Sequence, residues 1–472
     1  MHPMKTLLRS TRSIKSKLIL GSFAMVFASL TACAAQPNTE KDEKDEKASV
    51  SSIAIDHVWS GHRIKPYLLT RGKQQFVAYF DANRQMTVAH REGKAPWRYY
   101  KVDSWLGWDS HNYVTMELDS AGNLHVMGNM HADPMEYFRT SEPLNIRSLK
   151  RVPIMVDKKL EQRMTYPIFM LNKSGELLVK YRDGGSGNGN EIYNIYDTKT
   201  NSWSRLHANQ FLDGQGKMSG YFEGPTLGPD GMFHLIWVWR NTPNAATNHS
   251  LSYAKSADLV DWSDSQGNKL SLPLTLNNTE VVDPVPPKGG MINGNVKIGF
   301  DQNKKPVITY HKYDSNGDTQ MYVARLNGKQ GWDRVQISDW KGFRWDFSGG
   351  GSLGRFAVKP HNPEVLNDKE IGVLVRRNDD VMRFVLDAKT LKTKKVEQAN
   401  LYPPIIETQS IASNKGLLNG DTLALEHYVL AGKGDNTKSD FYLSFYSQPG
   451  NRDRAHSQIS PPSVLLLTEV QK

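Results

Sequence analysis

Short runs of alternating apolar and polar residues recur along the chain, and the clearest two flank a tight turn at residues 119–122. Residues 114–118 and 124–128 both alternate in this way, which predicts two antiparallel strands joined as a β-hairpin. His111 precedes the first strand and His131 follows the second. Because the start of one antiparallel strand and the end of its neighbour lie at the same edge, we expect the two histidines to meet in space.

The same pattern returns in further units, so the chain is predicted to consist of repeats. Clear copies occupy residues 166–182, 221–240 and 293–311, and weaker copies occupy 76–90, 371–387 and 422–446. With the hairpin at 111–131 these make seven units, each with roughly four short strands. A final strand at 464–468 is expected to pair with the early part of the chain and close a ring.

Repeated four-stranded sheets are typical of a β-propeller, because radial stacking hides the strand edges that an open sheet exposes. We therefore predict an all-β fold, a seven-bladed β-propeller. A pair of β-sandwiches is the alternative, but it does not explain why polar residues recur at the same position of each unit. No helix of convincing length is predicted in the mature chain.

Polar side chains stand where the first strand of a unit starts and where the second strand ends. If the hairpins surround one axis, these side chains face a common mouth, which is the predicted site. The residues at strand starts are His111, Tyr166, Tyr221 and Asn293, and those at strand ends are His131, Arg182, Arg240 and His311.

Composition and charge narrow the class of partner. The 472 residues, 10% of them aromatic, are compatible with one large all-β domain. A formal net charge of +10 indicates attraction to a polyanion such as nucleic acid, a membrane surface or an acidic polysaccharide. A basic surface that serves only solubility is the alternative. The chain has no Arg/Lys-rich helix or nucleic-acid-binding motif, which disfavours nucleic acid.

Residues 1–33 are predicted to be a lipoprotein signal peptide. A positively charged start precedes an apolar run at 18–30, which is too short to span a bilayer as an ordinary helix. The run ends in a sequence that resembles a lipobox, in which Cys33, the only cysteine of the chain, becomes lipidated. Ordinary signal cleavage near Ala34 is the alternative. Ala34 after the cysteine favours an outer-membrane lipoprotein, and a secreted protein is the other possibility.

The remaining chain divides into a linker and one domain. Residues 34–51 carry mixed charge and almost no hydrophobic side chains, which predicts a flexible tether. Residues 52–472 are predicted to form the catalytic β-propeller. The protein is expected to be a monomer that contacts a membrane through the lipid anchor only.

The predicted mouth is poor in carboxylates, whereas most glycoside hydrolases need two of them. Imidazole, phenol and guanidinium groups suit proton abstraction from an anionic sugar. In a β-elimination, a base removes the C5 proton of a uronate, an acid protonates the leaving oxygen on C4, and a cation neutralises the carboxylate. His and Tyr can act as base and acid, and Arg182 offers a bidentate fork for the carboxylate.

Four short motifs resemble the ulvan lyases of marine bacteria, namely His111-Asn112, His131, Tyr166-Pro167 and residues 180–184. The resemblance implies a polysaccharide lyase that cleaves ulvan, a sulfated rhamnose–uronate polysaccharide, at glucuronate or iduronate and needs no cofactor for the chemistry. It implies that His111 and Tyr166 share the proton transfers; His111 is our choice of base and Tyr166 of acid, and the reverse stays open. It also implies that Arg182 neutralises the carboxylate and that His131 supports Arg182 or orients the sugar.

Further residues of the mouth are expected to bind the substrate. They are Asn112, Tyr221, Arg240 and His311.

Two other functions are compatible with the sequence. A sialidase-like propeller hydrolase predicts an arginine cluster with a Tyr–Glu pair and repeated Ser-x-Asp-x-Gly-x-Thr-Trp boxes, of which residues 256–262 are a loose echo. A non-catalytic polysaccharide-binding lipoprotein would keep the basic, aromatic mouth. Residues 314–318 resemble a fragment of a calcium loop, so a structural calcium ion is possible, with a simple turn as the alternative.

Overall fold

The computed structural model describes residues 49–327, 331–419 and 423–472. The predicted signal peptide with Cys33 and the linker up to residue 48 lie outside the described residues, so the lipid anchor stays a prediction. Residues Ala48–Lys472 form a single unit. No helix in the described part of the chain is long and apolar enough to cross a membrane.

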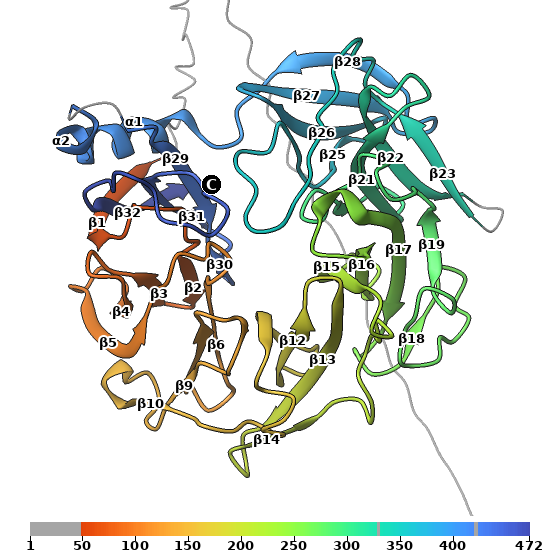
Figure 1. Ribbon diagram of the computed structural model, residues 1–472. Coiled ribbons are helices and arrows are strands. Elements are labelled where there is room, and N and C mark those ends of the chain that lie inside the picture. The colour runs from red at the N-terminus through yellow and green to blue at the C-terminus, as the bar shows by residue number, and fades with distance from the viewer. Residues whose placement is uncertain (1–48, 328–330, 420–422) are drawn as a thin grey trace, which may run out of the picture. The chain divides into compact units, whose positions relative to one another are not determined.

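Within the described ranges the strands form seven largely antiparallel sheets, which follow one another around a common axis (Figure 1). Their number equals that of the predicted repeat units. The first sheet holds β2 (Tyr67–Arg71), β3 (Gln74–Phe80), β4 (Gln85–Glu92) and β5 (Arg98–Trp105), with β30 (Lys433–Gly434) beside β2. The second holds β6 (Val114–Leu118), β7 (Leu124–Gly128), β9 (Tyr137–Thr140) and β10 (Leu149–Arg151).

The next two sheets carry most of the predicted site. The third holds β8 (His131–Asp133), β11 (Met164–Leu171), β12 (Leu177–Gly185), β13 (Asn188–Asp197) and β14 (Ser202–Arg205). The fourth holds β15 (Ser219–Leu227), β16 (Phe233–Arg240), β17 (Asn248–Ser256) and β18 (Trp262–Ser263), with β19 (Glu280–Asp283) paired to β17. Short 3₁₀ turns η1 (Ile146–Ser148) and η2 (Ala245–Thr247) connect strands within the second and fourth sheets.

The last three sheets complete the ring. The fifth holds β20 (Lys297–Phe300), β21 (Pro306–Tyr313), β22 (Thr319–Asn327) and β23 (Gly331–Gln336). The sixth holds β24 (Val358–Pro360), β26 (Glu370–Arg377), β27 (Asp380–Asp387) and β28 (Thr393–Gln398), with β25 (Glu364–Asn367) paired to β26. The seventh holds β29 (Glu426–Ala431), β31 (Ser439–Ser447), β32 (Ser463–Gln471) and β1 (Val50–Val58).

The core lies between the sheets rather than inside a single one. Six clusters of buried apolar side chains each join two neighbouring sheets within the described residues. For example, Phe76 of the first sheet and Met116 of the second belong to one cluster. The first five sheets are therefore covered on both faces, as the alternating patterns require. This arrangement confirms the predicted all-β propeller and excludes the pair of sandwiches.

The two ends of the described chain close the ring, as predicted. β1 pairs with β32 in antiparallel register, with Ile53 opposite Leu467 and Val50 opposite Val470. The strand β1 thus begins at Val50, whereas the tether was predicted to extend to residue 51. The difference arises because Val50 finds a backbone partner in β32.

A helix corrects the prediction that the mature chain has none. The helix α1 (Pro404–Ser413) and the short α2 (Lys415–Leu418) lie against the seventh sheet (Figure 1). Pro404 stands in the first turn, where its missing N–H costs nothing. Asn414 then accepts hydrogen bonds from Val464 N (2.8 Å) and Ser463 Oγ (3.0 Å). Only Ile406 and Ser410 of α1 are buried, which is too few positions to create a helical period in the sequence.

Replacing Leu467 by Ala is expected to destabilise the protein by about 2–5 kcal/mol, because the side chain is 1% exposed and packs between the seventh and first sheets. Urea unfolding would measure the loss. The matched control is Ile53→Ala on the paired strand, where the side chain is 42% exposed and a change below about 1 kcal/mol is expected. Equal losses in both variants would contradict the role of this closure.

Candidate active site

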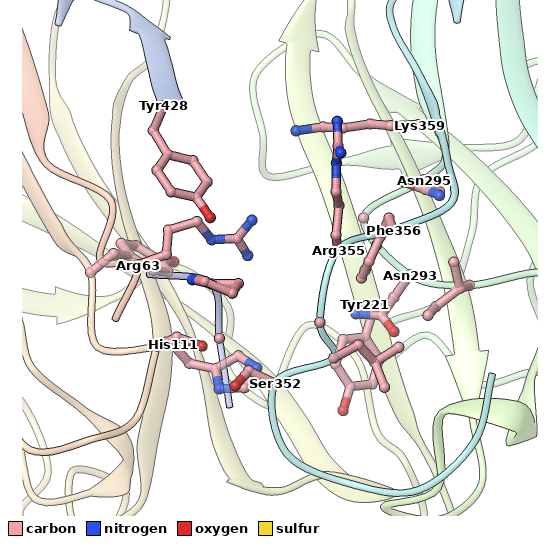
Figure 2. A pocket seen from close by; sticks show the side chains of 18 of the residues that line it. Arg63, His111, Tyr221, Asn293, Asn295, Ser352, Arg355, Phe356, Lys359 and Tyr428 are labelled. Atoms are coloured by element: carbon pink, nitrogen blue, oxygen red, sulfur yellow. The ribbon is translucent and has the colours of Figure 1, made fainter. Parts of the chain in front are cut away.

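A cavity of about 830 Å³ lies where strand starts and connecting loops of several sheets converge (Figure 2). His111, Tyr166, Tyr221 and Arg240 line it, as the repeat pattern predicted. The structure thus brings together residues that are up to 129 positions apart in the sequence. Its lining also includes charged side chains that the sequence analysis did not select.

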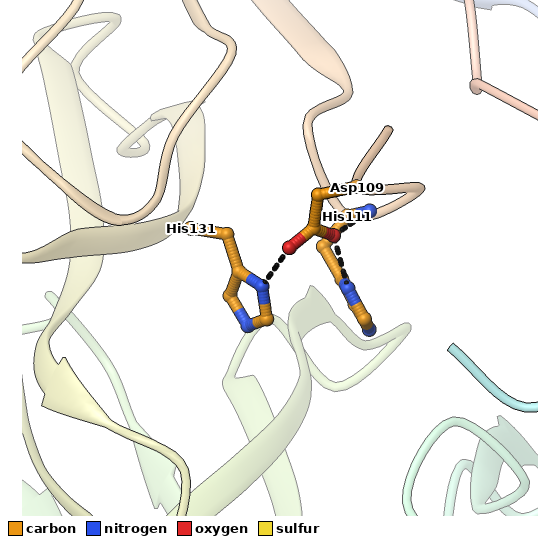
Figure 3. A group of neighbouring side chains, drawn as sticks. All are labelled: Asp109, His111 and His131. Atoms are coloured by element: carbon orange, nitrogen blue, oxygen red, sulfur yellow. Dashed lines mark hydrogen bonds and ion pairs between the residues drawn. The ribbon is translucent and has the colours of Figure 1, made fainter. Parts of the chain in front are cut away.

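The centre of the site is a carboxylate that joins two imidazoles (Figure 3). His111 Nδ1 donates a hydrogen bond to Asp109 Oδ1 (2.6 Å), and His131 Nδ1 donates to Asp109 Oδ2 (2.5 Å). The ring centroids of the two histidines are 4.3 Å apart. A carboxylate can only accept, so each Nδ1 carries a proton and each neutral ring has its free lone pair on Nε2.

The charge of Asp109 is stabilised by this arrangement. Burial alone would raise the pKa of its carboxyl group, but the hydrogen bonds from His111 and His131 outweigh burial and hold that pKa well below its usual range. A second carboxylate oxygen, Asp453 Oδ1, lies 3.8 Å from His111 Nδ1. Asp109 therefore stays negative at neutral pH.

Asp109 was not among the predicted site residues, because these were selected only at the starts and ends of strands. One local signal was present: an aspartate two residues before the histidine can cap its own turn. The structure shows this turn, in which His111 N donates to Asp109 Oδ1 (2.8 Å). The same oxygen therefore holds both the backbone and the ring of His111.

His111 and His131 lie side by side as predicted, but the chain path that brings them together differs from a simple hairpin. β6 pairs with β7 from Val114 opposite Gly128, and a Cβ on Gly128 would lie 2.5 Å from Tyr113 O, so only glycine permits this approach. The chain then turns at Asn129, whose φ is 63°. His131 consequently starts β8, which pairs with β11 of the third sheet instead of continuing the hairpin.

Tyr166 projects toward both histidines from a strained position. Its φ is 56°, which is unusual for a residue other than glycine, and it lies at a bulge in β11 between Thr165 and Ile168. Its ring centroid is 6.0 Å from those of His111 and His131. Burial raises the pKa of the Tyr166 hydroxyl, so the hydroxyl remains protonated and can donate at neutral pH.

Arg182 lies behind the cavity surface, which corrects the expectation of direct contact with a carboxylate. The side chain is 2% exposed. Its guanidinium donates to Tyr221 Oη (3.3 Å), Thr165 Oγ1 (3.2 Å) and Gly184 O (3.3 Å). It also lies 4.9 Å from the centroid of the Tyr166 ring. All its nitrogens serve protein acceptors, so Arg182 acts on the cavity through the two tyrosines.

Tyr221 and Arg240 stand at the cavity together. The guanidinium of Arg240 lies 5.5 Å from the centroid of the Tyr221 ring and donates to Thr242 O (3.1 Å) and to Pro243 O. Tyr221 Oη is within 2.6 Å of Ser186 Oγ. These contacts leave part of the Arg240 charge directed at the cavity.

Two predicted substrate-binding residues are structural instead. Asn112 is buried and donates to Asn129 Oδ1 (3.1 Å). His311 is 1% exposed, and its Nε2 accepts from Asn295 Nδ2 (3.0 Å). Burial lowers the pKa of His311 to about 4, so the ring is neutral. Neither side chain lines the cavity, because each points into the packing between strands.

Metal binding has one candidate location among the described residues. Ligand atoms of Asp109, His111 and His131 lie within 4.8 Å of one another, a spacing that an ion could bridge. Their mutual hydrogen bonds occupy both Nδ1 atoms and both carboxylate oxygens. At the predicted calcium fragment, Asp314 Oδ1 instead accepts from Asn316 N (2.9 Å) and Asp318 N (3.0 Å) of its own turn. Structural calcium stays a prediction.

A comparison with sequence families assigns the chain to a family. The profile of a family described as BNR repeat-containing family member matches residues 74–340, more than half of the chain. The protein belongs to the BNR repeat-containing family. Residues 256–262, the one box-like segment, form a turn of this BNR repeat-containing protein in which Asp258 Oδ1 accepts from Val260 N and Asp261 N (both 2.9 Å). Trp262 is buried, so the segment stabilises the fourth sheet.

Several known proteins with related sequence or fold are described as ulvan lyases or polysaccharide lyases. A long-isoform ulvan lyase of Alteromonas sp. (strain LOR) is 30% identical over 135 residues, covering 26% of this chain and 13% of that protein. The match therefore spans about an eighth of the relative's length, and it confirms the sequence resemblance over that part. The polysaccharide lyase Uly1 has a TM-score of 0.58 at 12% identity, covering 86% of this chain and 90% of the other.

A second solved structure shares the fold of this BNR repeat-containing protein. It is a PL25 ulvan lyase bound to -[GlcA(1-4)Rha3S]-, with a TM-score of 0.56 at 12% identity, covering 85% of this chain and 94% of the other. At this identity the likeness establishes the fold alone.

A buried ion pair supports the cavity wall beside Arg182. Lys180 Nζ lies 2.8 Å from Glu191 Oε1, and both side chains are almost fully buried. Replacing Lys180 by Met is expected to destabilise the protein by about 3–5 kcal/mol, because Glu191 is left buried without its partner. Urea unfolding would measure this loss.

Two variants control that measurement. The double variant Lys180→Met/Glu191→Leu is expected to recover most of the stability, because no unpaired charge remains. Lys150→Met, at an exposed strand position, should unfold like the wild type. A single Lys180→Met variant as stable as the wild type would show that the pair contributes nothing.

Proposed function

We propose that this protein is a polysaccharide lyase that cleaves an ulvan-type sulfated uronate polysaccharide by β-elimination. The observation that carries the proposal is the pair of histidines held by Asp109 with Nε2 free and Tyr166 beside them. The partial sequence identity to ulvan lyases and the shared fold support it. The basic lining of the cavity suits an anionic chain.

In this proposal, His111 and Tyr166 carry out the proton transfers. His111 Nε2 takes the C5 proton of the uronate, and the imidazolium that forms is stabilised by the negative Asp109. The C5–H electrons form the C4=C5 double bond as the C4–O bond breaks. Tyr166 then protonates the departing oxygen, which fits a hydroxyl whose pKa is raised by burial. His131, held by the same carboxylate, orients the sugar.

In this proposal, Arg240 and Arg182 both contribute to neutralising the uronate carboxylate. Arg240 stands at the cavity surface, and the hydroxyl of Tyr221 accepts a hydrogen bond from Arg182 behind it. When Ser186 Oγ donates to Tyr221 Oη (2.6 Å), the Tyr221 hydroxyl hydrogen can be donated to the substrate. The positive charge of Arg182 thereby acts through Tyr221, and Arg240 supplies a direct contact. A carboxylate so stabilised makes the C5 proton more acidic.

One feature of the hydrolase alternative is present. Tyr428 donates a hydrogen bond to Glu426 at the opposite end of the cavity, with Arg63 5.6 Å from the Tyr428 ring centroid. Elimination and hydrolysis leave different products, since only elimination leaves an unsaturated uronate. The assay below therefore separates the two chemistries.

The full chain is expected to release products with the ultraviolet absorbance of a conjugated double bond when it is incubated with ulvan. His111→Ala and Tyr166→Phe should each lower the rate about 100-fold or more, because each removes a proton-transfer group. Asp109→Asn should cause a similar loss with little change in KM, because an amide can hold only one ring in the required tautomer. His57→Ala, an exposed histidine on β1, is the matched control and should react like the wild type.

Other outcomes would reject the proposal. New reducing ends without the absorbance would mean hydrolysis. Bound but uncleaved polymer would mean a capture protein. Absorbance that persists at the wild-type rate in His111→Ala would refute the assignment of the base.

A further inference from the structure

A group of cationic side chains lies at the end of the cavity opposite the histidine pair. Figure 2 shows Lys359 across the cavity from His111, with Arg63 extending into the cavity between His111 and Tyr428. Arg63 precedes β2, and Lys359 belongs to β24 of the sixth sheet. The group, called here the cationic end, comprises Arg63, Lys65, Lys297, Lys359 and Arg376.

Most of this charge has no carboxylate partner. Lys297 pairs with Glu223 at 2.8 Å. Within the described residues, Arg63, Lys65 and Lys359 form no ion pair.

Of the group, Arg63, Lys359 and Arg376 line the cavity, where the carboxylates Glu407 and Glu426 are also present. In the described part of the chain, neither carboxylate forms an ion pair with these three cations, so their charge can attract an anion.

The guanidinium of Arg376 is fixed in place. It donates to Asn378 O (2.6 Å) and Phe356 O (2.9 Å), both of which are neutral acceptors. The orientation of Arg376 is therefore set by the protein while its positive charge stays available. A preorganised guanidinium of this kind suits recognition of an oxyanion.

The positive charges of the cationic end repel the ammonium group of Lys359. Burial, followed by the charges of the other four cations, lowers the pKa of its ammonium group to about 8. An anion placed among these side chains would reverse the repulsion. His361 adds a neutral hydrogen-bonding group, because its Nε2 is buried and has no partner in the described chain.

The reaction centre and the cationic end are separate parts of one cavity. Arg240 and the Arg182–Tyr221 pair are near the histidines, whereas the cationic end is built from other sheets. A volume of about 830 Å³ is in the upper part of the range of ligand pockets, so one polymer segment can reach both ends.

We propose that Arg63, Lys359 and Arg376 form a binding site for a tetrahedral oxyanion, occupied in the working protein by a sulfate ester of the polysaccharide. The choice of occupant rests on the proposed function, whereas the oxyanion site stands on the cluster itself. A sulfate ester keeps its charge at every working pH and offers three acceptor oxygens to separate donors. The site would hold the polymer at a distance from the uronate that reacts at His111.

Calorimetric titration of the full chain with inorganic sulfate, at constant ionic strength adjusted with sodium chloride, tests the site itself. Wild-type protein should bind sulfate, and Lys359→Met and Arg63→Met should each weaken binding about tenfold or more, since each removes a charged donor. Lys94→Met and Arg147→Met change exposed residues outside the cavity and should bind like the wild type. Unchanged affinity in both cavity variants would overturn the proposal.

Kinetics with ulvan and with chemically desulfated ulvan identify the occupant. Desulfation should raise KM about tenfold for the wild type and little for Lys359→Met, because the variant has already lost the contact. If desulfation leaves KM unchanged while inorganic sulfate and phosphate still bind through Lys359, the site takes a free oxyanion and the sulfate-ester assignment is wrong. If neither polymer is cleaved, the proposed function fails, and the calorimetric result still decides the site.

Sulfate affinity is expected to fall from about pH 7 to about pH 9 as Lys359 loses its proton, because its pKa lies near 8. Bound sulfate favours the protonated form and raises that pKa, so binding should take up a proton at the higher pH. His361, whose pKa is lowered to about 4, stays neutral across this range. Charges facing Lys359 come from Arg63, Lys65, Lys297 and Arg376, with Glu223 paired to Lys297.

Calorimetry in buffers of different ionisation enthalpy would measure this proton uptake. Lys359→Met should lose the pH dependence, and Lys359→Arg should bind sulfate equally at both pH values. Affinity of the wild type that is constant with pH would show that Lys359 does not contact the anion.

Discussion

Apolar packing between neighbouring sheets is the interaction on which the rest of the structure depends. Each sheet is too small to bury its own faces, so it relies on neighbouring sheets to cover them. Six apolar clusters join neighbouring sheets among the described residues, and the pairing of the first strand with the last ties the two ends of the chain together. The pairing of β1 with β32 supplies that closure and gives all sheets a common axis. The cavity follows from this geometry, because strand starts of different sheets converge there.

Electrostatics divides the cavity into two parts with different tasks. At the reaction centre, a single carboxylate, Asp109, fixes two histidine rings and places their free lone pairs where they can accept a proton. At the cationic end, Arg63 and Lys359 carry charge that the protein leaves unpaired. The first part suits chemistry and the second suits holding an anion. A long anionic polymer is the kind of ligand that can use both at once.

The range of the family match can be compared with the positions of these residues in the sequence. His111, Tyr166 and Arg240 lie within residues 74–340, which match the BNR repeat-containing family. Arg63 and Lys359 lie outside the matched range. The histidine pair therefore lies in the part of the chain that matches the family, whereas the cationic end combines Lys297 from that part with residues outside it.

The sequence by itself determined the all-β class, the repeat units, the closure by the terminal strands and the presence of His111, Tyr166, Tyr221 and Arg240 at one mouth. Alternation and turn residues are local signals, and a repeated hairpin carries the same phase into each sheet. Only the tertiary structure revealed Asp109 as the partner of both rings, the burial of Arg182 and His311, and the cationic end. These depend on which way a side chain turns and on contacts between distant segments, which no local pattern encodes. The helix α1 was missed for a related reason, since it is held by docking on the seventh sheet rather than by its own amphipathic period.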